Sequence, residues 1–124
     1  MRNGLLTRYA QNDDGAAAVE FALVEPLFLS LIFAIGYAGL MIYTGVGMQT
    51  AVERAARCYS VQSRTGQATC DTATSTQSYA QSIYQGVSTP TFVASTPSCG
   101  HQVTATLTFN VGWSVPLTAQ SCFP

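Results

Sequence analysis

A long uncharged apolar run near the N-terminus limits the possible folds more than any other feature. Pro26 to Met48 comprises 23 residues without Asp, Glu, Lys or Arg. A helix rises about 1.5 Å per residue, so this run exceeds the roughly 20 residues that cross a bilayer. The chain has 124 residues, too few for two independent cores once such a helix is subtracted. We therefore expect one membrane-spanning helix attached to one small domain.

A cleaved secretory signal peptide is the competing interpretation, with Arg2 and Arg8 as its basic region. The apolar run is longer than the apolar region of a cleaved signal peptide, which argues against this interpretation. Acidic residues also separate these arginines from the run: Asp13, Asp14, Glu20 and Glu25.

The entrance to the apolar run carries a compact motif, in which Gly15 is followed five residues later by Glu20 and then by Phe21. A carboxylate near the centre of a membrane helix costs about 2.5–3.5 kcal/mol, so acids in such helices usually have a function. An interfacial acid that reaches back to water is the alternative for Glu20. The motif reads Gly15-Ala16-Ala17-Ala18-Val19-Glu20-Phe21-Ala22-Leu23-Val24-Glu25-Pro26-Leu27-Phe28.

This segment resembles the processing site of type IV prepilins, in which a leader ends in Gly and Glu stands fifth in the mature chain. The longer string from Gly15 to Phe28 resembles the TadE-like pseudopilins of tight-adherence (Flp) pilus systems. The motif resemblance covers residues 13 to about 60. Beyond that segment only the general layout agrees.

The resemblance implies that a prepilin peptidase cuts between Gly15 and Ala16, which makes residues 1–15 a cytoplasmic leader. It also implies that Glu20 acts between subunits. The Glu20 carboxylate of one subunit compensates the N-terminal amine on Ala16 of a neighbouring subunit, and this pairing sets the register of assembly.

Two positions near the motif have expected roles of their own. Glu25 occupies a place where TadE-like chains usually carry an aliphatic residue, and a second acid expected near Phe33–Tyr37 is absent. Glu25 is therefore a candidate second buried acid, about 7.5 Å further along the helix axis than Glu20. Pro26 lacks an N–H and its ring crowds the preceding turn, so it is expected to bend or locally open the helix.

The helix is expected to continue beyond the membrane. After the apolar run, apolar positions recur at intervals of three and four residues, which is a helical stripe. We predict one helix over residues 16–61, which spans the membrane at about residues 21–48 and is amphipathic beyond. The stripe comprises Met48, Ala51, Val52, Ala55, Ala56 and Tyr59.

Residues 62–124 are predicted to form a small α+β domain. The expected fold class is therefore α+β and pilin-like, with a small antiparallel sheet. Asp71 or Thr72 is expected to cap a second helix that runs to about Gln85. Residues 91–94 form a short candidate strand. Residues 102–111 alternate apolar and polar side chains, the pattern of a half-buried strand, and the tail is expected to return along it.

All four cysteines follow the apolar run, which indicates a disulfide framework in an oxidising compartment. We therefore expect a single-pass bacterial inner-membrane protein with a cytoplasmic N-terminus and a periplasmic C-terminal domain. The arginine distribution does not choose an orientation. Four cysteines permit three pairings. Chain geometry favours Cys58–Cys70, which closes a local loop, and Cys99–Cys122, which joins the ends of a hairpin.

The composition argues against catalysis, cofactors, metal binding and nucleic-acid binding. His101 is the single histidine and no acid follows Asp71, so a Ser-His-Asp arrangement has no third member. Cys99 and His101 fall short of the four ligands of a structural zinc site. The net charge is −1 and lysine is absent, so no basic surface for nucleic acid is expected.

The expected function is that of a minor pseudopilin in the priming or tip complex of a tight-adherence pilus. The expected partners are the prepilin peptidase, other pilins and pseudopilins, and the inner-membrane assembly platform; after assembly the chain could lie at the pilus tip or the cell surface. No charged residue follows Asp71, which suits a domain that packs against copies or partners. The alternative is an unprocessed, membrane-anchored extracytoplasmic adhesion or ligand-binding module. Cleavage after Gly15 discriminates between the two.

Overall fold

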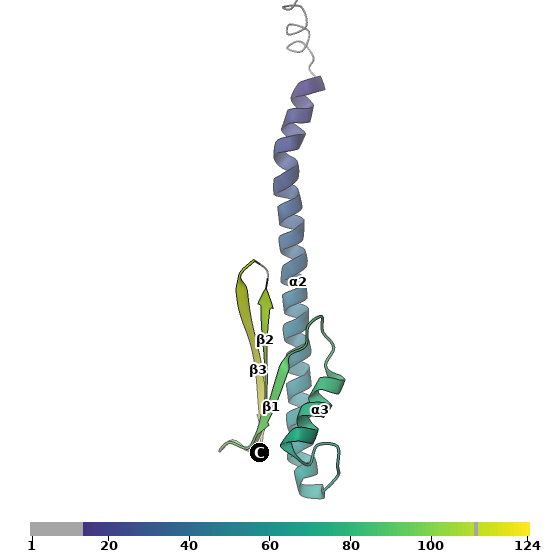
Figure 1. Ribbon diagram of the computed structural model, residues 1–124, viewed down its shortest axis with the longest axis vertical. Helices are drawn as coiled ribbons and strands as arrows, with labels where there is room; N and C mark the ends of the chain where they lie inside the picture. Colours follow the sequence, from purple (N-terminus) through teal and green to yellow (C-terminus); the bar gives the residue numbers. More distant parts are fainter. Residues whose placement is uncertain (1–13, 111) are drawn as a thin grey trace, which may run out of the picture. The chain divides into compact units, whose positions relative to one another are not determined.

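The computed structural model describes residues 14–110 and 112–124. The expected leader up to residue 13 and Val111 of the expected strand lie outside the described residues. The chain divides into two compact units, one ending at Tyr37 and the other comprising Ala38–Pro124. The elements along the chain are α2 (Asp14–Thr65), α3 (Ala73–Ile83), β1 (Thr91–Ser95), β2 (His101–Asn110) and β3 (Ser114–Phe123), as Figure 1 shows. The expected α+β fold is confirmed.

The first half of α2 has the character of a membrane helix. Every residue from Gly15 to Leu40 is exposed, although most of them are apolar. Among the described residues, α2 is long and apolar enough to cross a membrane. The helix continues through Pro26 without interruption. The bend expected at this proline stays a prediction.

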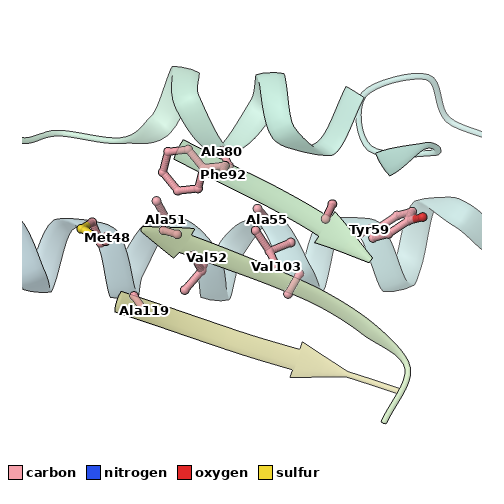
Figure 2. Close-up of a cluster of buried hydrophobic side chains, with 12 residues drawn as sticks. Met48, Ala51, Val52, Ala55, Tyr59, Ala80, Phe92, Val103 and Ala119 are labelled. Carbon is pink, nitrogen blue, oxygen red and sulfur yellow. The ribbon is translucent and has the colours of Figure 1, made fainter. Parts of the chain in front are cut away.

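The second half of α2 is the central helix of the domain. The six residues of the predicted stripe are all buried, and they form the core together with residues from α3 and the sheet, as Figure 2 shows. The helix continues to Thr65, one turn beyond the expected end at about Val61. Gly66 follows with φ of 68°, and its N–H donates to the carbonyl of Gln62 at 2.9 Å. A glycine in this conformation satisfies carbonyls that the helix end leaves free.

The second helix is capped by Thr72 rather than by Asp71. The Thr72 hydroxyl accepts a hydrogen bond from the Ser75 N–H at 3.2 Å, and the Ser75 hydroxyl in turn accepts from the Thr72 N–H at 3.1 Å. This reciprocal pair is a capping box. The helix ends at Ile83, two residues before the expected end, because Tyr84 is already extended.

The sheet is an antiparallel meander in the order β1-β2-β3. Its inner face packs against α2 through Phe92 and Ala94 of β1, Val103 and Ala105 of β2, and Ala119 of β3. The alternation read from residues 102–111 matches the burial along β2, where Val103 and Ala105 are buried and Thr106 and Thr108 are exposed. The tail returns along β2, as expected.

Two disulfides tie the domain together, and both have the expected pairing. Cys58–Cys70 joins α2 to the loop that precedes α3, and Cys99–Cys122 joins the turn before β2 to the end of β3. The side chain of Gln62 also holds the loop, because its carbonyl oxygen accepts from the Cys70 N–H at 2.9 Å.

Candidate processing and assembly segment

The expected scissile bond, between Gly15 and Ala16, lies within α2, whose described part begins at Asp14. Both residues of the bond are helical and exposed.

Packing against the described residues does not require glycine at position 15. A Cβ placed on Gly15 would meet no heavy atom of the described residues within 4 Å. Alanine also favours the helix over glycine by roughly 0.5–1 kcal/mol. Any requirement for glycine at this position therefore comes from outside the described part of the chain.

Glu20 and Phe21 project from the next turn and are exposed, Phe21 at 68%. Glu20 lies four residues after Ala16, so the two positions share one face of the helix. Side chains on a helix lean toward its N-terminus, which directs the carboxylate toward Ala16. Glu20 therefore presents a carboxylate on the face of α2 that carries Ala16.

Glu25 faces elsewhere. Five residues after Glu20, it is rotated by about 140° around the helix axis and lies about 7.5 Å further along it. Both acids are exposed within this chain, and α2 does not bring them together. A single neighbouring group cannot contact both carboxylates from one side of the helix. The two acids therefore present separate points of contact.

A close contact in the Ala38–Pro124 unit was not foreseen from the sequence. Gly47 of α2 lies under a loop of its own chain. A Cβ on Gly47 would lie 2.6 Å from the Gln85 carbonyl oxygen and 3.5 Å from the Tyr84 ring. The nearby glycines at 36, 39 and 45 have open space at the same position. Gly47 is therefore a packing residue of the domain.

Tyr84 is half-buried under this loop. Its hydroxyl and that of Thr44 are both buried without a hydrogen-bond partner among the residues that the structure describes. The Tyr84 ring packs edge-on against Phe92, with ring centres 6.0 Å apart. Burial, with a smaller contribution from Tyr43, raises the pKa of the Tyr84 hydroxyl above its ordinary value. The loop therefore closes the end of the core nearest Thr44.

His101 closes the opposite end. Its ring meets Tyr59 edge-on at 4.3 Å, and its Nε2 lies 3.2 Å from the Ser63 hydroxyl. The sequence contains no acid after Asp71 that could complete a catalytic triad with this pair. Within residues 14–110 and 112–124, no cluster of three His, Cys, Asp or Glu residues could hold a metal ion. The Ser63–His101 contact joins α2 to β2.

Comparison with known proteins finds one region of similarity, which lies in α2. Residues 15–57 match the family model described as TadE-like protein. The resemblance identified from the Gly15–Phe28 string is thereby confirmed. A search of curated proteins and a search of solved structures found no match. The matched segment contains the whole motif and most of the buried stripe of α2, and it ends before the first disulfide loop.

Proposed function

From the TadE-like segment at residues 15–57, we propose that this chain is a minor pseudopilin of a tight-adherence pilus. A prepilin peptidase removes residues 1–15, and the mature chain joins other pilins and pseudopilins on an inner-membrane assembly platform. It acts in the priming or tip complex, because the domain after residue 61 adds bulk that a helix-only shaft subunit lacks.

The observation that carries the proposal is the placement of the motif on α2. Glu20 stands one turn beyond Ala16 on the same face of the helix, and both residues are exposed. Cleavage would leave an ammonium group on Ala16, and a carboxylate from a neighbouring helix would relieve its desolvation. The motif thus acts between subunits.

The proposed orientation has the C-terminal domain in the periplasm. Both disulfides lie in this domain, and stable disulfides belong to oxidising compartments. The motif would then face the cytoplasmic side of the membrane, where the leader would be accessible to the peptidase.

Gly15→Ala tests processing. The native protein should have its N-terminus at Ala16, measured by mass spectrometry of purified membranes, whereas the variant should retain the leader. Because the space around Gly15 is open, the substitution does not disturb the packing of residues 14–110 and 112–124. Gly36→Ala is the matched control, since its site on the same helix is equally open, and it should be processed normally. Recovery of chains that begin at Met1 from cells with an active peptidase would contradict the proposal and favour the adhesion module.

Glu20→Gln tests assembly. The change removes the charge and keeps the shape, so insertion and cleavage should persist while co-purification with partner pilins is lost. Leaving an ammonium group buried without its partner costs about 3–5 kcal/mol. Glu53→Gln is the matched control, because Glu53 is an exposed acid on the same helix outside the Gly15–Phe28 motif, and it should retain assembly. Wild-type assembly by the Glu20→Gln protein would contradict this role and show that Glu20 serves only as an interfacial anchor.

A further inference from the structure

The β2–β3 hairpin extends beyond the rest of the sheet. Strand β1 pairs with residues 102–106 of β2 only. Residues 107–110 of β2 pair solely with residues 114–117 of β3, so this part of the hairpin has no third strand beside it. We call residues 107–110 and 112–117 the hairpin tip.

The hairpin tip points toward the N-terminal end of the helical segment that it accompanies. Strand β2 begins beside the last turns of α2, where His101 contacts Tyr59 and Ser63. Further along, Ala119, the strand partner of Ala105, lies level with Met48 and Ala51 along α2 (Figure 2). The strand therefore runs antiparallel to α2, and the hairpin continues past the core in that direction, as Figure 1 shows.

The reach of the hairpin tip follows from strand and helix geometry. Five residues separate Ala105 from Asn110, and at about 3.3 Å per residue they span roughly 16 Å. At about 1.5 Å per residue, α2 covers the same distance in about eleven residues. Counting back from Ala51 puts the end of the hairpin at the level of about Leu40.

The surface at this level is apolar, aromatic and free of charge. Trp113 in the hairpin turn is 73% exposed, and on α2 the side chains of Ile42 and Tyr43 are 68% and 54% exposed. No Asp, Glu, Lys or Arg follows Asp71, so the hairpin tip carries no charged side chain that would oppose its approach to a lipid surface. Tryptophan and tyrosine favour the interface between lipid and water, where the ring is shielded and the polar group is hydrated.

The backbone limits where the hydrocarbon of a membrane can end. Open strand edges and irregular loops do not face lipid tails, because their N–H and C=O groups would lack partners. The free edge of β3 and the loop at residues 84–90 over Gly47 must therefore lie outside the hydrocarbon. This condition moves the end of the membrane span from the expected residue 48 to about Leu40. The segment from Phe21 to Leu40 then supplies the roughly 20 residues that a span needs.

We propose that the hairpin tip is a second membrane contact, in which Trp113 lies among the lipid headgroups of the bilayer that α2 spans. The occupant is the bilayer surface, because the hairpin tip lies at the level where α2 passes from the wholly exposed apolar segment, residues 15–40, to residues that the domain partly covers. The inference requires that α2 spans a membrane. It does not depend on cleavage after Gly15 or on a pilus. The contact fixes the height of the domain above the membrane.

The single tryptophan of the chain makes the proposal directly measurable. The full chain is reconstituted in phosphatidylcholine vesicles whose acyl chains are brominated either near the headgroup or near the bilayer centre. Trp113 emission should shift to shorter wavelength, and shallow bromines should quench it more strongly than deep ones. Full quenching by the deep bromines alone would overturn the headgroup position.

A matched reporter controls for vesicle binding. The double variant W113F/V61W moves the single tryptophan to a site on α2 that is 56% exposed and about 31 Å beyond Leu40. Its fluorescence should be unaffected by either lipid. Equal quenching of native Trp113 and the V61W reporter would refute the proposal. A blue-shifted native emission without bromine quenching would also refute it, because a second protein copy would then cover the hairpin tip.

Discussion

Replacing Gly47 with alanine tests whether the loop after α3 can pack closely against α2 only because residue 47 has no side chain. The new Cβ would lie 2.6 Å from the Gln85 carbonyl oxygen, which is closer than carbon and oxygen normally approach. A backbone carbonyl cannot swing aside as a flexible side chain can. The loop must therefore shift, and Tyr84 with it.

Gly45→Ala supplies the matched control, because a Cβ on Gly45 meets no heavy atom within 4 Å. Both substitutions gain the same helix propensity, about 0.5–1 kcal/mol. Forcing extra volume into a packed site typically costs about 1–3 kcal/mol. Propensity cancels between the variants, so Gly47→Ala should be less stable than Gly45→Ala by about 1–3 kcal/mol. Gly45→Ala itself should be slightly more stable than the native protein.

Urea unfolding of the full chain in detergent micelles, with the disulfides intact, measures this difference. Near-ultraviolet circular dichroism follows the packed rings of Tyr59 and Tyr84, which report the domain rather than the membrane helix. The expected gap between the two variants corresponds to at least about 4 °C in Tm for a domain of this size. Equal midpoints for the two variants would show that the loop does not rest on Gly47 in solution.

Three further predictions concern the domain. Tyr84→Phe should be nearly neutral at pH 7, because the hydroxyl it removes is buried without a partner among the described residues. Burial raises the pKa of Tyr84, so the native protein should lose stability as pH rises above the ordinary value of about 10, and the variant should lose less in alkaline urea titrations. Replacing Cys58 and Cys70 together with serine should cost about 2–4 kcal/mol in denaturant unfolding, and an unchanged midpoint would contradict this. Val103→Ala should cost about 1.5–3 kcal/mol because Val103 is fully buried, whereas Val93→Ala on the outer face should change stability by less than about 0.5 kcal/mol in the same assay.

The sequence predicted those features that depend on local periodicity. The stripe from Met48 to Tyr59 is buried as expected, since a helix repeats its faces every three to four residues whatever packs against it. The alternation in β2 predicted its inner face for the same reason. Both disulfides were predictable because each closes a short path along the chain. The TadE-like likeness rests on a contiguous string and was equally accessible.

Features that depend on tertiary contacts escaped prediction. The role of Gly47 could not be foreseen, because glycine in an apolar helix suits a neighbouring membrane helix and a covering loop equally well. The level reached by Trp113 depends on the register of β2 against β3 and on the place where the sheet meets α2. The helix ends at Thr65 rather than near Val61, since the following Gly66 provides the left-handed stop. The pattern of polar residues did not reveal that stop.

The meander arrangement has a consequence for how the domain forms as it emerges from the membrane. Neighbours in the sheet are neighbours in sequence, and the Cys58–Cys70 link spans a separation of 12 residues. The contacts between residues far apart in sequence are those that pack the sheet and the C-terminal segment against α2. One example is the hydrogen bond that the Ser60 hydroxyl donates to the main-chain oxygen of Pro124, 64 residues away in sequence. Folding therefore needs one long-range closure, onto a helix that is synthesised first. Chains whose contacts are mostly local reach the native state quickly, which shortens the time during which an uncharged strand edge lies open to neighbouring chains.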